Sequence, residues 1–165
     1  FINDLGGGKY ATGRKMFSEF NKRLSFMTPK QIEVLLDGDL PTQKQIAFVS
    51  VCKTYGFIRD FVIEVVREKY LVYDYQITEG DYISFYRRKL DLHDEMVTLT
   101  ELTQKKIKQV TFKILEQAGF IDTIKSRNIQ PQIIDLKLMN AIVQDNPNWL
   151  KVLLVSDMDI ERTQN

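Results

Sequence analysis

The chain has 165 residues, 44% of them hydrophobic, which is enough for one domain with a real hydrophobic core. Its formal net charge of only +1 argues against a strongly basic nucleic-acid coat protein. The longest apolar run, Ile46 to Cys52, is far shorter than the roughly 20 residues that cross a bilayer, so we expect no membrane span. Because Cys52 is the single cysteine, we expect a buried, unreactive thiol and a cytoplasmic protein.

Charge is distributed unevenly along the chain. Residues 1–27 carry five basic and two acidic groups, and residues 101–130 carry six and three, so both blocks are positive. The segments between and after them, residues 28–100 and 131–165, are negative. A shared binding surface therefore requires the fold to bring the two positive blocks together. The chain begins at Phe1, not at methionine, so we expect a single domain, 1–165, that lacks an N-terminal segment of the full-length protein.

Helical periodicity dominates the sequence and predicts an all-α, compact helical bundle. The first predicted helix covers residues 13–24 and is capped by Thr12. Its apolar side chains fall within one 100° arc. Its basic side chains are Arg14, Lys15, Lys22 and Arg23.

Three further helical stretches are predicted from cap signatures and apolar spacing. They are a short helix from Thr28 to Gly38, a long apolar stretch from Pro41 to Tyr70 that breaks near Gly56, and a helix over residues 79–90 that starts at Thr78 with Asp81. The long stretch is apolar almost all round, so we expect it to form the core.

The most informative segment is a basic helix predicted over residues 99–118. Thr98 and Glu101 match a capping box, and Gly119 supplies a stop. The lysines of this helix are Lys105, Lys106, Lys108 and Lys113. Phe112 falls on the polar side of the helix, where we expect a partner or another part of the chain to cover it.

The chain after the basic helix is less regular. Residues 120–134 are rich in β-branched and aromatic residues without helical spacing and predict a small β wing that carries Lys125 and Arg127. Two short closing helices are predicted, from Pro131 to Val143 and from Pro147 to Val155, and the tail from Ser156 is expected to fray. A basic helix followed by a basic extended segment is the order found in winged-helix DNA-binding proteins, and it indicates phosphate contact.

Residues suited to catalysis or metal binding are scarce. His93 is the single histidine and lies in a polar connection. Residues Gly6 to Lys9 lack the spacing of a phosphate-binding loop. We therefore expect no enzyme activity, no metal site and no cofactor.

Two long segments resemble the BrxA family of the BREX (bacteriophage exclusion) systems. The first contains D-F-x-x-E-V-V-R-E-K from Asp60 to Lys69. The second contains T-x-K-K-x-K-Q from Thr103 to Gln109 and L-x-x-A-G-F-I from Leu115 to Ile121. The order and spacing of these motifs, more than any one of them, carry the resemblance, which extends over nearly the whole chain.

The resemblance implies a NusB-like helical fold with helix-turn-helix elements and non-catalytic binding of double-stranded DNA. It also implies that helix 13–24 is the second helix of an N-terminal helix-turn-helix whose first helix precedes Phe1. Combined with the basic patterns, it predicts a set of DNA-binding residues: Arg14, Lys15, Lys22, Arg23, Lys105, Lys106, Lys108, Lys113, Lys125 and Arg127. Two alternatives stay open, namely a scaffold subunit that binds other BREX proteins and a NusB-like protein that binds RNA.

Overall fold

The structure is a computed structural model that describes residues 2–165, apart from the side chain of Asn3. It confirms the all-α prediction, and within the described residues it contains helices and no strand. In chain order the elements are α1 (Ile2–Leu5), α2 (Tyr10–Ser25), α3 (Pro29–Asp37), α4 (Leu40–Thr54), α5 (Gly56–Phe61), the π-helical turn η1 (Val62–Arg67), α6 (Glu68–Leu71), α7 (Glu79–Leu92), α8 (Asp94–Val97), α9 (Glu101–Ala118), α10 (Leu136–Val143), the 3-10 helix η2 (Pro147–Leu153) and α11 (Asp157–Arg162).

Most helix boundaries follow from their caps. Thr28 forms a complete capping box with Gln31 at the start of α3, and Thr78 forms one with Asp81 at the start of α7. Gly119 ends α9 in the left-handed conformation, with φ of +81°, which glycine adopts without strain. These three predictions are confirmed.

The predicted cap of the basic helix at Thr98 was wrong. Thr98 follows the short helix α8, and Thr100 caps α9 by accepting a hydrogen bond from the Thr103 amide at 3.2 Å. The helix therefore begins at Glu101. The first helix also differs from its prediction, since α2 starts after Lys9, three residues earlier than expected and without a side-chain cap.

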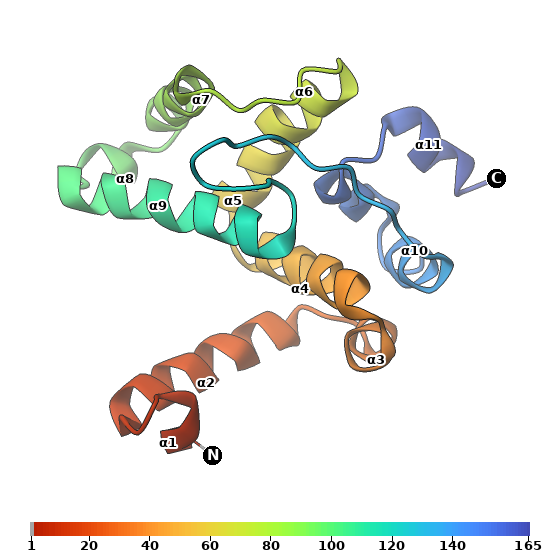
Figure 1. Ribbon diagram of the computed structural model, residues 1–165, viewed down its shortest axis with the longest axis horizontal. Helices are drawn as coiled ribbons and strands as arrows, with labels where there is room; N and C mark the ends of the chain where they lie inside the picture. The colour runs from red at the N-terminus through yellow and green to blue at the C-terminus, as the bar shows by residue number, and fades with distance from the viewer. Residues whose placement is uncertain (1) are drawn as a thin grey trace.

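The core is built around the predicted apolar stretch, now divided among α4, α5, η1 and α6 (Figure 1). Phe61 is fully buried, and its ring meets those of Phe85 from α7 and Phe112 from α9 edge-on, at centroid distances of 5.1 and 5.7 Å. Phe48 of α4 contacts Phe120 just beyond α9 in a tilted arrangement, with a centroid distance of 4.2 Å and an interplanar angle of 34°. Phe112 is thus covered by the chain itself, which resolves its position on the polar side of the basic helix.

The predicted β wing at residues 120–134 is a compact loop without a strand. Only isolated bridges occur there, between Ile121 and Ile129 and between Gln76 and Asn128. The Asp122 carboxylate shapes the loop because Oδ1 accepts from the amides of Thr123 and Asn128, at 2.6 and 2.9 Å. Local side-chain hydrogen bonds therefore replace the ladder that β-rich composition suggested.

The C-terminal segment is helical, so the expectation of a frayed tail was wrong. Ser156 caps α11 by accepting from the Asp159 amide at 3.1 Å, and Ile160 of this helix is buried in the core. Arg67, at the end of the π-helical turn, donates to Val155 O at 2.8 Å and pairs with Asp157 at 2.9 Å. This buried guanidinium holds the tail against the central helices.

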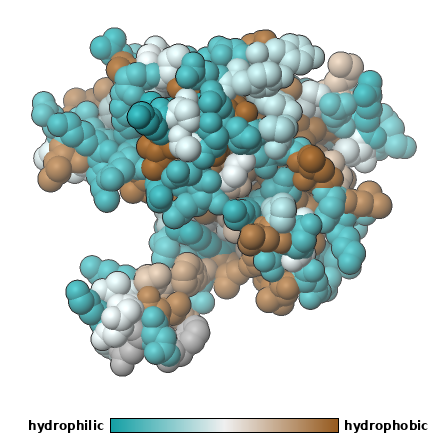
Figure 2. All heavy atoms as spheres, in the orientation of Figure 1, coloured by the Kyte–Doolittle hydropathy of each residue, from teal (hydrophilic) through white to brown (hydrophobic). Residues whose placement is uncertain are grey.

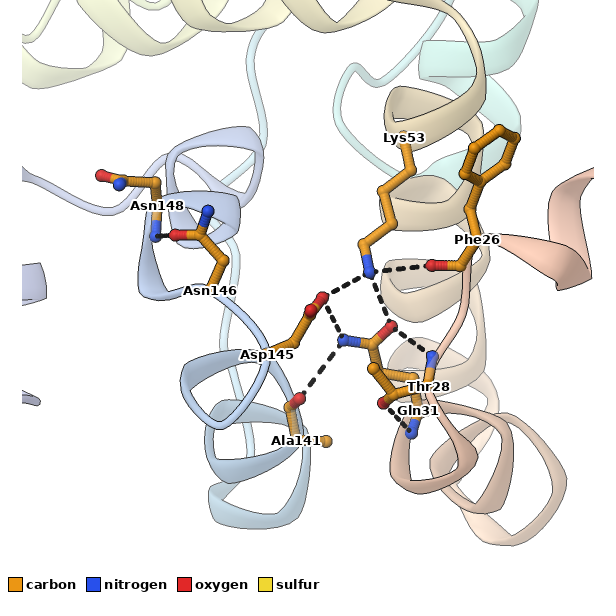
Figure 3. A network of polar contacts seen from close by, with 8 residues as sticks. All are labelled: Phe26, Thr28, Gln31, Lys53, Ala141, Asp145, Asn146 and Asn148. Atoms are coloured by element: carbon orange, nitrogen blue, oxygen red, sulfur yellow. Dashed lines mark hydrogen bonds and ion pairs between the residues drawn. The ribbon is translucent and has the colours of Figure 1, made fainter.

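One buried polar network joins α3, α4 and α10 (Figure 3). Lys53 Nζ of α4 contacts Phe26 O at 3.0 Å, Gln31 Oε1 at 2.9 Å and Asp145 Oδ2 at 2.5 Å. Gln31 Nε2 in turn donates to Ala141 O and to Asp145. The network satisfies a buried lysine and ties the N-terminal helices to the C-terminal ones. Among the helices of residues 2–165, none is both long and apolar enough to cross a membrane.

Candidate nucleic-acid interface

The first basic element is α2, whose cationic side chains lie along one protruding helix. Arg14, Lys15 and Lys22 are exposed and have no ion pair among the described residues, whereas Arg23 is half-buried and donates to Glu19 Oε1 at 3.0 Å. Lys22 and Arg23 lie in the last turn, where the helix dipole stabilises positive charge. α2 therefore keeps three cations available for an anionic partner.

The second basic element is α9. Lys105 and Lys106 are exposed, and no carboxylate in the described part of the chain pairs with them. Lys113 is also exposed, but it pairs with Glu116 at 3.2 Å along the same helix. Such an exposed pair is weak and exchanges readily for a phosphate.

Tyr55, at the junction of α4 and α5, brings the two basic helices into one neighbourhood. Lys22 Nζ and Arg23 Cζ lie 5.2 and 5.8 Å from the centroid of the Tyr55 ring. The same tyrosine lines a pocket of about 360 Å³ together with Lys106 of α9. α4 contacts both α2 and α9 and lies between them (Figure 1). Tyr55 is thus a neighbour of basic residues from both positive blocks of the sequence.

Arg14 and Lys15 lie farther from α9, about 10–12 Å along α2 from Lys22. Beside them α1 folds back onto α2 at Gly13, where a Cβ atom would come within 1.7 Å of the Ile2 carbonyl oxygen. Gly13 therefore allows the close approach of α1. Arg14 and Lys15 extend the basic surface away from α9 and do not join the cluster at Tyr55.

Lys108 and Arg127 are held in an internal ion-pair network by Glu79, the first residue of α7. Lys108 Nζ pairs with Glu79 Oε1, and Arg127 Nη1 contacts Glu79 Oε2 at 2.9 Å. The Arg127 guanidinium also stacks 4.0 Å above the Phe112 ring centroid. Burial and the neighbouring Arg127 charge lower the pKa of Lys108. Two cations share one carboxylate here, so the network keeps an excess of positive charge.

Lys125 is exposed on the loop shaped by Asp122. The adjacent Arg127 has a φ of +55°, a left-handed conformation that turns the chain back toward α7. Lys125 therefore stands on the loop surface, while Arg127 faces inward to Phe112 and Glu79. Lys125 and Arg127 were both predicted to bind DNA, but only Lys125 is exposed on the surface.

Two contributors to the interface were missed by the sequence analysis. Tyr55 carries one signal, because it directly precedes the helix break at Gly56, where a side chain can reach toward a neighbouring helix. Glu79 carries no such signal, because its partners Lys108 and Arg127 are 29 and 48 residues away in the sequence and reach it only in the folded protein.

Two further features concern metal binding and the cysteine. Within residues 2–165 no group of three or more His, Cys, Asp or Glu side chains is arranged to hold a metal ion. Cys52 is fully buried, and burial raises the pKa of its thiol, as expected for an inert core cysteine.

Comparison with solved structures supports the fold. A crystal structure of an uncharacterized protein from Magnetospirillum magneticum superimposes with a TM-score of 0.71, covering 88% of this chain and 73% of that one at 18% sequence identity. At this identity the similarity concerns the fold alone.

Sequence comparison identifies relatives with a common name. The chain is 25% identical over 130 residues to the BREX protein BrxA of Bacillus cereus (strain H3081.97), covering 78% of this chain and 65% of that protein. It is 21% identical over 128 residues to the BREX protein BrxA of Escherichia coli O9:H4 (strain HS), covering 78% and 60%. The aligned part thus spans less than two thirds of these relatives' length. The BrxA family model matches residues 5–146, most of the chain, and the protein therefore belongs to the BrxA family.

Proposed function

We propose that the protein is a non-catalytic component of a BREX phage-defence system that binds double-stranded DNA. The observation that carries this proposal is that Tyr55 has basic neighbours from both helices, since Lys22 and Arg23 of α2 lie over its ring and Lys106 of α9 lines the same pocket as Tyr55. The names of the relatives supply the BREX assignment. Basic side chains from two helices with a fixed separation suit the repeating phosphates of a duplex.

The contacts of this surface are to phosphates. Lys22, Lys105 and Lys106 are flexible point charges without ion-pair partners in the described residues, so they can neutralise phosphates without breaking an internal ion pair. Phosphate contacts position a protein on DNA but carry no sequence information. We therefore propose binding with little sequence preference.

A salt series tests this proposal. Because each neutralised phosphate contributes about −0.9 to the slope of log K against log salt, Lys105→Ala/Lys106→Ala should flatten the slope for a duplex by up to about 1.8. The control is Lys30→Ala/Lys137→Ala, which removes the same charge from α3 and α10. An unchanged slope in the α9 variant, or equal flattening in the control, would reject the assignment. Stronger competition by hairpin RNA than by duplex DNA would favour the RNA-binding alternative.

A second function, binding another BREX protein, is favoured by one observation that DNA contact does not explain. The apolar face of α2 is partly exposed. Co-purification of the full-length protein with the other BREX proteins, with and without nuclease, tests this function. Partners that remain after nuclease treatment indicate direct protein contact, and partners that are lost indicate bridging by DNA.

A further inference from the structure

A groove runs between the two basic helices. Its walls and floor come from α2, α4 and α9, and it encloses about 510 Å³. The apolar residues that matter most are Phe20 and Leu24 from α2, Ala47 and Val51 from α4, and Ile114 and Ala118 from α9. In Figure 2 the end of the molecule formed by α1 and α2 stands apart from the body, with an open notch between them.

The wall formed by α2 carries large apolar side chains that are partly exposed. Met16, Phe17, Phe20 and Leu24 share one side of the helix and are 37–40% exposed. Their spacing along the chain corresponds to about 12 Å of helix. A contiguous exposed stripe of this kind marks an interaction site, since a folded monomer normally covers such a face.

The floor of the groove carries small side chains. Ala47 of α4 is exposed in the groove, and Ala118 of α9 is only partly covered. Small side chains at these two positions let another backbone approach closely, while Phe20 and Leu24 on the facing wall offer surface to apolar anchors. This is the arrangement of helix-in-groove recognition, in which anchors at i, i+4 and i+7 enter an apolar cleft.

The charge around the groove selects the partner. Arg23 and Lys44 line it, and Lys44 has no acidic partner among the described residues. Lys22 and Lys106 lie nearby at Tyr55. Acidic residues beside the anchors of an incoming helix would complement this rim, whereas basic ones would be repelled.

A second copy of the chain fits this charge poorly. From Lys9 to Ser25, the segment containing α2 carries five basic side chains and one acidic one. Packing two such helices face to face would gather ten positive charges and only two negative ones at one interface. The DNA backbone is also a poor occupant, because phosphates gain nothing from an apolar floor.

We propose that this groove binds an amphipathic helix of another protein, with apolar anchors on one face and acidic residues beside them. The inference rests on the proposed second function and specifies the chemistry of its partner. Lys15 of α2 and Lys105 of α9 do not belong to this rim and remain available to DNA while the groove is occupied.

The test is a displayed library of amphipathic helices that share an apolar stripe and carry Glu, Gln or Lys at random in the flanking positions, selected on the immobilised protein. We expect the enriched peptides to be acidic at the flanking positions. Their affinity for the Ala47→Phe variant should be about tenfold lower than for the unaltered protein, because the new side chain fills the groove from an exposed helix position. Asn140→Phe adds the same side chain to an exposed position of α10 and should bind as the unaltered protein does. No enrichment, or enrichment of neutral or basic flanks, would overturn the proposal.

Charge reversal and self-association complete the test. Lys44→Glu should lower the affinity for the acidic peptides about tenfold and raise the affinity for the basic ones. A concentration-dependent dimer in sedimentation velocity that Ala47→Phe abolishes would show that a second copy fills the groove instead, and would overturn the proposal. Because Ala47→Phe removes no charge, its affinity for duplex DNA should be unchanged. Groove binding and DNA binding can therefore fail independently.

Discussion

The ammonium of Lys53 lies 2.5 Å from the carboxylate of Asp145, joining α4 to the segment just beyond α10 (Figure 3). The Lys53 side chain is only 6% exposed, and its position 5.6 Å from the Trp149 ring centroid adds a cation–π contact. Two regions of the chain that are 92 residues apart therefore depend on one buried charge.

Removing that charge should destabilise the protein strongly. Lys53→Met removes the ammonium that neutralises Asp145 and donates to Gln31, and breaking a buried pair in this way costs about 3 kcal/mol of unfolding free energy. Urea unfolding followed by circular dichroism measures the loss. The matched control is Lys30→Met, which breaks the exposed Lys30–Glu33 pair at 3.6 Å and should cost less than about 0.5 kcal/mol. Equal losses in both variants would contradict the role assigned to Lys53.

The same pair predicts a dependence of stability on pH. Burial alone would raise the pKa of the Asp145 carboxyl, but hydrogen bonds from Lys53 and Gln31 hold it below its ordinary value. A carboxyl with a lowered folded-state pKa stabilises the fold fully above its unfolded-state pKa, about 3.9, and this stabilisation is lost as the pH falls through the folded-state value. Asp145→Asn should therefore lose stability at pH 7 and show a flatter decline below about pH 5 than the unaltered protein. Urea titrations at pH 7 and below pH 5 measure the free energy of unfolding of both proteins. An equal decline in the variant and the unaltered protein would contradict this coupling.

Asp122 should control the loop that replaces the predicted wing. The Asn128 side chain donates to its carboxylate, as do the amides of Thr123 and Asn128, and together they lower the pKa of Asp122 to about 2. Asp122→Ala should therefore speed hydrogen exchange at the Asn128 amide while leaving α9 protected. In the unaltered protein this protection should persist until the pH approaches about 2. Unchanged exchange at Asn128 in the variant would show that the loop is held by other contacts.

Glu79 should restrain DNA binding. Glu79→Gln removes the charge that pairs with Lys108 and Arg127, so both cations become available to phosphates. We expect tighter duplex binding and a salt slope steeper by up to about 1.8. Glu33→Gln on α3 removes an equal charge far from α9 and controls for net charge. An identical gain in both variants would indicate a general charge effect and no specific release.

Much of the fold could be predicted because its signals are local. The caps at Thr28 and Thr78 and the stop at Gly119 depend on neighbouring residues, and each prediction was confirmed. The cap at Thr98 failed because two threonines, Thr98 and Thr100, offer similar patterns and only the path of the chain after α8 decides between them.

The candidate site was less accessible to sequence reasoning. The basic residues of α2 and α9 were evident from the sequence, but their shared neighbour Tyr55 and the pairing of Glu79 with Lys108 depend on contacts between distant segments. The exposure of the α2 apolar stripe could not be predicted either, because helical spacing marks an apolar face without showing what covers it.

The most direct measurement is photo-crosslinking of duplex DNA to a benzophenone side chain placed, in separate variants, at positions 22, 106 and 137. If α2 and α9 form one DNA surface around Tyr55, positions 22 and 106 should both crosslink and lose the signal at high salt, while position 137 on α10 should not react. Crosslinking at only one of positions 22 and 106, or equally at all three, would contradict a shared surface.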